Sequence, residues 1–298
     1  MTDLVHIRAF LPSDRASLIE ISKHTWGGYD QLPYELDDLI ENPASYLFVM
    51  EFKNRIVAFA NLNLIDNGKT AWMEHMRVHW RYRKRGFAWT MTQRLISEAE
   101  ALGVKRLRLA TTVENEATRR ITMRIGMRPI LQMKIFWKGK FRGIRWKDVS
   151  VPIVSCTPQE AYAFLEAHSV LVPEGIITYN WHAFDFTKEL FKSMGERFRF
   201  WKGGENCTRA SLSFGYLGSI RDTLVWISTI YASDSKSFYS ALSHQLETAK
   251  RELAQEFLCF HSRQFQAAQE IPGLKQRTFS SQLVLYEKHR PFRNPSKC

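Results

Sequence analysis

Hydrophobic positions in the first half of the chain alternate between a period of two and a helical period, a pattern typical of short strands interleaved with helices. Apolar side chains at every second position predict a strand at Val5–Phe10, and the run Pro12–Asp14 predicts the start of a helix over Ser17–Lys23. The same signals predict a helix at Pro33–Glu41, strands at Tyr46–Glu51, Ile56–Leu62 and Trp72–Val78, a helix at Ala88–Leu102, a strand at Leu107–Thr111 and a helix at Glu116–Ile125. The predicted order is one strand, two helices, three strands, a helix, a strand and a helix.

The second half of the chain repeats part of this order. The pattern predicts strands at Ala210–Tyr216 and Thr223–Tyr231, a helix at Phe238–Leu253, and strands at Glu256–His261 and Gln282–Glu287. We interpret this half as a second, degenerate copy of the same α/β unit. Because the boundary is expected between Lys147 and Pro158, the predicted domains are residues 1–150 and 151–298.

Composition supports a folded protein without a membrane segment. Of the 298 residues, 45% are hydrophobic and 24% charged, as in ordinary globular proteins. No apolar run reaches the roughly 18 residues that span a bilayer, and Met1–Asp14 lacks the pattern of a signal peptide, so we expect a cytoplasmic protein and no membrane partner. The cysteines form no C-x-x-C pair, and we expect neither a disulfide framework nor a metal site; they are Cys156, Cys207, Cys259 and Cys298.

Positive charge is concentrated in one part of the sequence. The net charge is +12 overall and +10 within residues 101–150, whereas residues 1–50 carry −5. Such a basic segment favours an anionic partner, namely nucleic acid, anionic lipid or a polyphosphate cofactor. The alternative is a solvated surface that binds nothing.

The motif with the clearest chemistry follows the strand that ends at Val78. Arg83, Gly86 and Ala88 fit the pattern R/Q-x-x-G-x-G/A, and a helix begins near Gly86. Backbone N–H groups at a helix start face an anion, and small residues allow a pyrophosphate to approach the backbone. Because three fixed positions recur by chance, the motif gains its weight from the strand before it and the helix after it.

These features resemble the GNAT acetyltransferase superfamily over roughly residues 5–130. The segments that carry the resemblance are Ile7-Arg8 followed by Ser13-Asp14, the loop Arg83–Ala88, and Asn115–Ala117 leading to Gly126-Met127. The chain also resembles the animal histidine N-acetyltransferase group, whose members carry a GNAT-like C-terminal domain. That closer resemblance, looser after residue 182, rests on Trp26–Pro33, Ile65–Gly68, Glu74–Val78 and Gly175–Trp181.

The resemblance implies an α/β (α+β) GNAT fold, in which a mixed, mostly antiparallel sheet is flanked by helices. It implies an acetyl-CoA-binding catalytic domain at residues 1–150 and a degenerate GNAT-like domain at residues 151–298. Pantetheine is expected between the strands Trp72–Val78 and Arg106–Thr111, with the Met76–Val78 backbone polarising the thioester carbonyl. The residues expected to bind acetyl-CoA are Met76, Arg77, Val78, Arg83, Lys84, Arg85, Gly86, Phe87, Ala88 and Asn115.

Acetyl transfer to an amine needs a base, because an ammonium group has no lone pair. Glu74 is the candidate, since positions two apart on a strand share a face and Glu74 is then expected to point the same way as Met76 and Val78. The alternative is an ordinary ion pair with Arg77 or a neighbouring strand. Thr122 stands where the superfamily often has a tyrosine as general acid. It could orient a water, and a thiol with a pKa near 8.5 is a tolerable leaving group without an acid.

The acceptor site is predicted at the acidic N-terminal segment. Tyr29 and Asp30 are expected to meet the acceptor, because an acidic surface suits a cationic amine. For the other acids of this segment, from Glu35 to Glu41, the alternative is the charged surface of an amphipathic helix. An amino-acid acceptor also needs a cation for its carboxylate, for which Arg8, Arg77 and Arg145 are candidates.

The sequence therefore predicts an acetyl-CoA-dependent N-acetyltransferase that acts by direct transfer on a small amine or amino acid, with L-histidine as one candidate acceptor. Two alternatives stay open, a protein or peptide N-acetyltransferase and a non-catalytic protein that binds acyl-CoA or nucleic acid. Nucleic acid is the less expected partner, because aromatic residues do not alternate with the basic ones in a stacking pattern. The second half lacks an R-x-x-G-x-A loop, so we expect no second cofactor site. The oligomeric state stays open.

Overall fold

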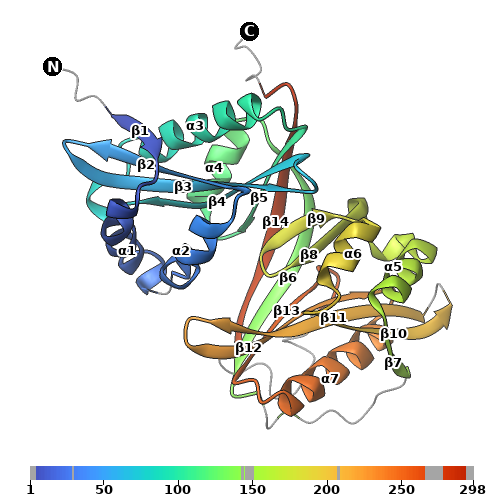
Figure 1. The fold of residues 1–298 in the computed structure, drawn as a ribbon. Coiled ribbons are helices and arrows are strands. Elements are labelled where there is room, and N and C mark those ends of the chain that lie inside the picture. The colour runs from blue at the N-terminus through green and yellow to red at the C-terminus, as the bar shows by residue number, and fades with distance from the viewer. Residues whose placement is uncertain are drawn as a thin grey trace. The chain divides into compact units, whose positions relative to one another are not determined.

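The chain forms two packing units (Figure 1). This computed structural model describes residues 5–28, 30–141, 144, 151–206, 209–265 and 278–292. The first unit comprises Met1–Leu109, Arg120–Arg128 and Tyr286–Cys298, and the second comprises Ala110–Arg119 and Pro129–Leu285. Each unit thus draws on segments that are distant in the sequence, whereas the division at residue 150 concerns domains along the chain and stays a prediction.

The first unit has the element order predicted from the sequence. Its strands are β1 (His6–Ala9), β2 (Ser45–Phe52), β3 (Arg55–Ile65), β4 (Thr70–Val78) and β5 (Arg106–Thr112). Its helices are α1 (Arg15–Lys23), α2 (Leu32–Glu41), α3 (Phe87–Ala101) and α4 (Glu116–Arg124). β1 to β4 are antiparallel neighbours, β5 runs parallel to β4, and β14 (Thr278–His289) follows β5. β5, α4 and β14 each contribute residues to both units.

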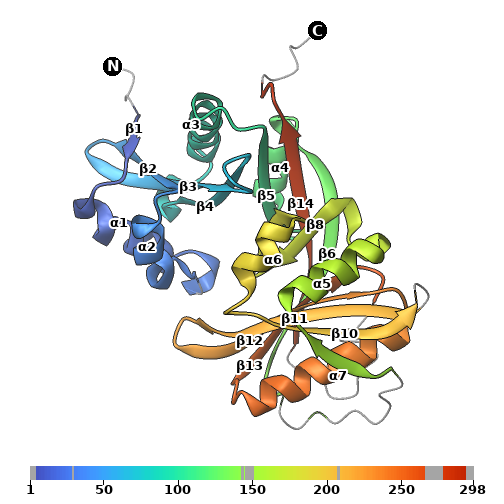
Figure 2. The ribbon, with the colours of Figure 1, turned by 45° about the vertical axis from the view of Figure 1, so that its right-hand side comes forward.

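Helices cover both faces of the sheet in the first unit. α1 and α2 lie on one side of β2, β3 and β4, and α3 lies on the other (Figures 1 and 2). Leu18 and Leu36 of the two helices pack against Val49 and Phe59 of the sheet. On α3 the buried positions follow the helical period, as predicted; they include Phe87, Met91, Leu95 and Ala99. The face under α1 and α2 is the one that carries the candidate site.

The second unit is built on a sheet of the same kind. Its strands run in the order β14-β6-β13-β12-β11-β10-β7, and only β12 and β13 are described as parallel neighbours. They are β6 (Arg128–Gly139), β7 (Ile153–Cys156), β10 (Arg199–Asn206), β11 (Arg209–Ile220), β12 (Thr223–Ala232) and β13 (Glu256–Ser262). The other elements are α5 (Pro158–Ala167), α6 (Lys188–Met194), α7 (Ser235–Arg251) and the hairpin β8 (Ile176–Tyr179) with β9 (His182–Asp185).

The structure confirms the predicted fold class, a mixed and mostly antiparallel sheet flanked by helices. In the second half, the predicted strands and helix correspond to β11, β12, α7, β13 and β14. The sequence analysis did not predict β6, although Leu131, Met133 and Ile135 alternate with Gln132 and Lys134. Within the described ranges, no helix has both the length and the apolar content needed to cross a membrane.

Candidate active site

An irregularity interrupts the pairing of β3 with β4. Phe59 lies opposite Arg77, but Asn61 lies opposite Glu74, so two steps along β3 correspond to three along β4. The extra residue is accommodated near His75, whose φ of 52° is left-handed. β4 therefore contains a β-bulge, which re-aims the side chains that follow it.

The bulge changes which side chains share a face with Glu74. Directly opposed residues of an antiparallel pair lie on the same face, and Phe59 packs under α1 and α2. Arg77, opposite Phe59, therefore joins the face of Glu74, whereas Val78 pairs with Ala58 and lies on the other side. The expectation that Glu74 shares a face with Val78 is wrong, because regular alternation ends at the bulge.

Glu74 is connected to two neighbouring strands by side-chain hydrogen bonds. Asn61 of β3 donates from Nδ2 to Oε1 of Glu74 at 2.8 Å. Ser45 of β2 donates from Oγ to Oδ1 of Asn61, also at 2.8 Å. Asn61 is fully buried. The candidate base is thus held from the interior of the sheet, and the sequence alone gave no sign of this connection.

The predicted acceptor residue Asp30 is engaged by Arg77. Arg77 donates from Nε to Oδ2 of Asp30 at 2.7 Å and from Nη2 to Oδ1 at 2.9 Å. Burial raises the pKa of Asp30, but the hydrogen bonds and charge of Arg77 outweigh burial and hold that pKa below its usual range. The pair brings together two predicted site residues whose charges offset each other. Tyr29, its predicted companion, and Arg145 lie outside the described residues.

The loop between β4 and α3 has the geometry of an anion site. A 3-10 turn at Trp80–Tyr82 follows β4, and Gly86 then stands at the N-cap of α3 with a left-handed φ of 84° and no side-chain cap. Glycine adopts this conformation without the penalty that a Cβ atom brings. The first N–H groups of α3 are therefore left to a ligand or solvent, as an anion site requires.

The basic side chains of this loop divide into two roles. Arg83 donates to the backbone carbonyls of Val78 and His24, each at 3.2 Å, and so braces the loop. Lys84 and Arg85 are exposed, with the Arg85 guanidinium 5.4 Å from the ring centroid of Tyr82. Lys84 and Arg85 are thus the side chains that can meet an anion directly.

The first turn of α3 supports the loop from below. Phe87 is buried, and its ring lies 5.3 Å from that of Phe52 and 6.5 Å from that of Tyr82. Ala88 is half-buried beside it. Phe87 therefore anchors the helix start by packing.

The second half of β4 does not continue the strand pairing with β5. Their parallel pairing extends over Thr70–Trp72 and Arg106–Arg108, although β4 continues to Val78. Backbone groups of β4 beyond Trp72 are therefore outside this ladder, on the strand where pantetheine amides were expected to bind. Met76 lies in this part of β4.

Two further predicted residues lie on or beside α4. Thr122 is fully buried, and its carbonyl accepts the N–H of Met127 at 2.9 Å. Asn115 belongs to the second packing unit, where its Oδ1 accepts the N–H of Thr118 at 3.3 Å. Asn115 thus contributes to the start of α4, and its role toward a cofactor stays a prediction, as does the role of Thr122.

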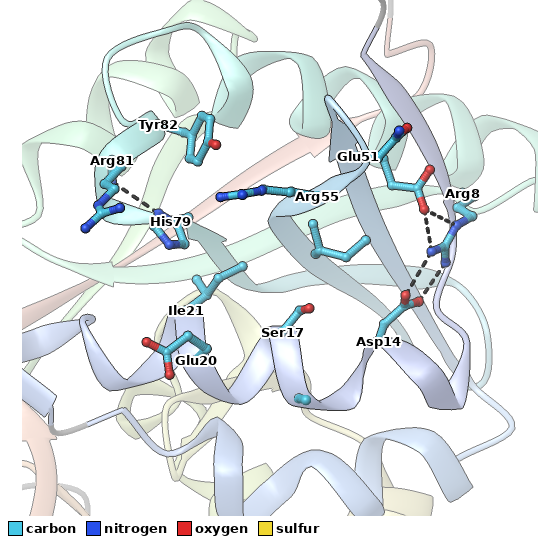
Figure 3. A pocket seen from close by; sticks show the side chains of 13 residues that line it. Arg8, Asp14, Ser17, Glu20, Ile21, Glu51, Arg55, His79, Arg81 and Tyr82 are labelled. Carbon is cyan, nitrogen blue, oxygen red and sulfur yellow. Dashed lines mark hydrogen bonds and ion pairs between the residues drawn. The ribbon is translucent and has the colours of Figure 1, made fainter.

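A pocket of about 550 Å³ lies between α1, the β2–β3 hairpin and the His79–Tyr82 turn (Figure 3). On one wall Arg8 donates to both oxygens of Asp14, at 2.6 and 2.8 Å, and to Glu51 at 2.6 and 2.9 Å. The hydrogen bond from Arg8 is the main reason why the pKa of Asp14 is lowered. Neither Glu74 nor residues 83–88 line this pocket, but His79, Arg81 and Tyr82 do, so it borders the candidate site at the turn that follows β4.

Some of the basic side chains that were expected to bind an anionic partner instead contact other side chains of the protein. Arg108 is buried, with Nε 2.6 Å from Glu287 and Nη1 3.1 Å from Asp66. Arg124 lies 3.8 Å from the ring centroid of Trp89. The charge of residues 101–150 is thus partly structural, which weakens the argument for nucleic acid.

Comparisons with known proteins concern the sequence of the first part of the chain and the fold of most of it. Residues 15–127 match the model of the acetyltransferase (GNAT) family. Similar solved structures include a putative acetyltransferase from Thermoplasma acidophilum, 14% identical over 95% of this chain and 99% of that one, with a TM-score of 0.61. A GCN5-related N-acetyltransferase from Sphaerobacter thermophilus is 14% identical over 96% and 95%, with a TM-score of 0.61. No curated protein sequence matches significantly.

A tandem GNAT protein from the clavulanic acid biosynthesis pathway is also similar, with 12% identity, coverage of 96% of this chain and 98% of that one, and a TM-score of 0.57. At such low identity these structures speak for the fold. Residues 15–127 thus share the sequence features of the acetyltransferase (GNAT) family, in a chain that has the GNAT fold and carries a second GNAT-like domain.

Proposed function

We propose that this protein is an acetyl-CoA-dependent N-acetyltransferase that transfers the acetyl group directly to the amine of a small molecule or amino acid. The observation that carries the proposal is the juxtaposition of two features on one strand. β4 bears Glu74, held by Asn61, and leads into the uncapped N-terminus of α3 at Gly86. A carboxylate and an anion site on one strand suit proton removal beside a phosphate-bearing donor.

The residues of the first unit fit such a donor. The N–H groups of the first turn of α3, with Lys84 and Arg85, would hold the pyrophosphate. Backbone groups of β4 beyond Trp72, which lie outside the ladder with β5, would bind the pantetheine amides. When bound, acetyl-CoA supplies the acetyl group as a thioester.

Glu74 would act as the base. Its carboxylate takes a proton from the acceptor's ammonium group, directly or through water, so that the nitrogen lone pair can attack the thioester carbonyl carbon. The new N–C bond forms as the C–S bond breaks, the thiolate leaves, and the second proton that the nitrogen must lose goes to this thiolate or to solvent. Because a thiol has a pKa near 8.5, the thiolate is a tolerable leaving group, and the mechanism does not depend on the hydroxyl of buried Thr122.

L-histidine is the acceptor we propose first, because of the resemblance of segments such as Glu74–Val78 to the histidine N-acetyltransferase group. The acidic side chains near this part of β4 favour a cationic acceptor, since Glu35 of α2 lies 3.7 Å from the His75 imidazole. Two of the candidates for binding the acceptor's carboxylate, Arg8 and Arg77, already bind carboxylates of the protein. A protein acceptor is the main alternative.

A binding and turnover experiment tests the proposal. Acetyl-CoA affinity is measured by calorimetry, and thiol release is followed with a panel of amino acids, including histidine, and with polyamines and peptides. For Glu74→Gln we expect unchanged affinity and a fall in kcat of at least about 100-fold, the usual scale for a missing base. Glu41→Gln, at an exposed glutamate of α2, is the control and should retain activity.

Each other outcome has a definite meaning. Unchanged turnover of Glu74→Gln removes Glu74 from the mechanism. Thiol release with peptides alone makes the protein a peptide acetyltransferase. Binding of acetyl-CoA without release on any acceptor contradicts the enzymatic proposal, and absence of acetyl-CoA binding contradicts the site itself.

A further inference from the structure

Asn61 is a polar side chain in an otherwise apolar part of β3. It has no exposure to solvent, and its neighbours Ala60 and Leu62 are equally buried. Burying an amide costs free energy unless its polar atoms are hydrogen-bonded. An apolar residue would fill this position without that cost. The reason for an asparagine here therefore lies in its two hydrogen-bond partners, Ser45 and Glu74.

The hydrogen bonds of Asn61 have a fixed direction. Ser45 donates to the amide oxygen, which turns the amide nitrogen toward Glu74. An ionised carboxylate only accepts, so the amide N–H is a suitable partner for it. The chain Ser45, Asn61, Glu74 therefore orients the amide as a donor to the carboxylate.

We infer that Asn61 is a positioning residue for Glu74, acting as a neutral donor that fixes the carboxylate beside the bulge of β4. The inference rests on the proposed function, because it assigns Asn61 a part in the same reaction. Asn61 donates to one oxygen of Glu74 and so fixes the orientation of the carboxylate on the strand. Its neutrality matters, since a cation here would offset the charge that the acceptor's ammonium group meets.

The same strand offers a matched control. Asn63 lies two residues further along β3, and its Oδ1 accepts a hydrogen bond from Nδ2 of Asn42 at 3.3 Å. It sits opposite Trp72 instead of Glu74. Asn63→Leu therefore removes a side-chain hydrogen bond between neutral amides from the same strand without removing the donor to Glu74.

The test combines turnover with a direct titration of Glu74. Asn61→Leu should lower kcat about tenfold, with acetyl-CoA affinity unchanged, because the Glu74 carboxylate loses the donor that holds it in position for proton transfer. It should also raise the pKa of the Glu74 carboxyl, read by carbon-13 NMR, by about 1 and move the acidic limb of the pH profile of kcat/KM equally. Asn63→Leu should change neither quantity.

Two more variants separate positioning from folding. Asn61→Asp keeps the side-chain shape but sets a carboxylate beside Glu74, and two adjacent carboxyls share one proton, so the pH profile should move further than in Asn61→Leu. Ser45→Ala removes only the hydrogen bond that Ser45 donates to the amide oxygen of Asn61. It should lower kcat about threefold and shift the pH profile in the same direction as Asn61→Leu. Intact folding is checked for each by thermal unfolding and acetyl-CoA affinity.

The inference and the proposed function fail in different ways. If Asn61→Leu leaves both the Glu74 titration and the pH profile unchanged, Asn61 does not position Glu74 and the inference is overturned. If its kcat falls while both stay unchanged, the effect is merely structural and the inference is also overturned. If the titration moves but wild-type protein acetylates no amine, Asn61 still controls Glu74 and the proposed function is what fails.

Discussion

Both packing units contain a strand–helix–strand motif with parallel strands. In the first unit the two strands pair over a shorter length and the helix has no side-chain cap, whereas in the second the strands pair further and the helix is capped. β4, α3 and β5 correspond to β12, α7 and β13, with the two strands parallel in each case. β12 and β13 pair from Val225–Ile230 to Glu256–His261, twice the length of the ladder between β4 and β5. β12 also pairs with β11 without a register shift, whereas β4 is bulged against β3.

The starts of the two helices differ in the same sense. α3 begins at Gly86 without a side-chain cap, whereas Asp234 caps α7 by accepting the N–H groups of Lys236 at 2.8 Å and Ser237 at 3.2 Å. A carboxylate of the protein thus sits where an external anion would bind. An anion site therefore depends on which N–H groups are left unsatisfied at the helix start more than on the topology.

The largest expected effect follows from closing the open helix start. Gly86→Glu forces a side chain into a left-handed backbone conformation and adds a negative charge at the loop. Acetyl-CoA affinity, measured by calorimetry, should fall more than about 100-fold. Gly68→Glu, at another left-handed glycine with open space around it, is the control. Equal losses in both variants would show that the effect is general strain.

A second change tests how much the ion pair between Asp30 and Arg77 of the bulged strand stabilises the protein. Asp30→Asn leaves Arg77 without its buried partner and should lower the free energy of unfolding by about 3 kcal/mol at pH 7. Because the pKa of Asp30 is lowered in the folded protein, its stabilisation is complete above the unfolded pKa near 4 and is lost as the pH falls through the folded value. The difference from wild type in urea unfolding should therefore shrink with acidification.

The control for this change is the exposed pair of Arg15 and Asp37. Asp37→Asn should have little effect, since solvent screens exposed ion pairs. A difference between Asp30→Asn and wild type that stays constant down to pH 2 would show that the ion pair is not its source.

The smallest expected effect concerns the second unit. Asp234→Ala removes the cap of α7 and should cost about 1 kcal/mol of stability in thermal or urea unfolding. Calorimetric titration with acetyl-CoA should still give one site per chain, because β12 and β13 stay paired. A second acetyl-CoA site in this variant would mean that the Asp234 cap alone prevents α7 from binding a cofactor as α3 does.

The hydrophobic pattern predicted nearly all the elements of the first unit because its strands and helices are short and strongly periodic. The motif of Arg83, Gly86 and Ala88 predicted the loop and the start of the helix near Gly86, since it is local in sequence. The bulge at His75 was not predictable, because Trp72, Met76 and Val78 stand at even spacing, as in an unbroken strand. A register shift depends on the partner strand, which the pattern of one strand does not reveal.

Contacts between distant residues mark the other limit of sequence reasoning. Asp30 and Arg77 were each predicted to meet a ligand, yet they bind each other across 47 residues. Asn61 gave no signal, since a single polar residue in a strand is ordinary. Composition indicates that such groups exist, but only the fold decides whether their partners are ligands or other side chains.

The ion pair of Arg108 with Glu287 has a consequence for how the protein is made. The two residues are 179 positions apart, yet both belong to the first packing unit. At a synthesis rate of roughly 5 to 20 residues per second, about 10 to 40 s separate their translation. On the ribosome, the whole second unit is therefore synthesised before Arg108 can meet its carboxylate, and the part of β14 that belongs to the first unit is added after it.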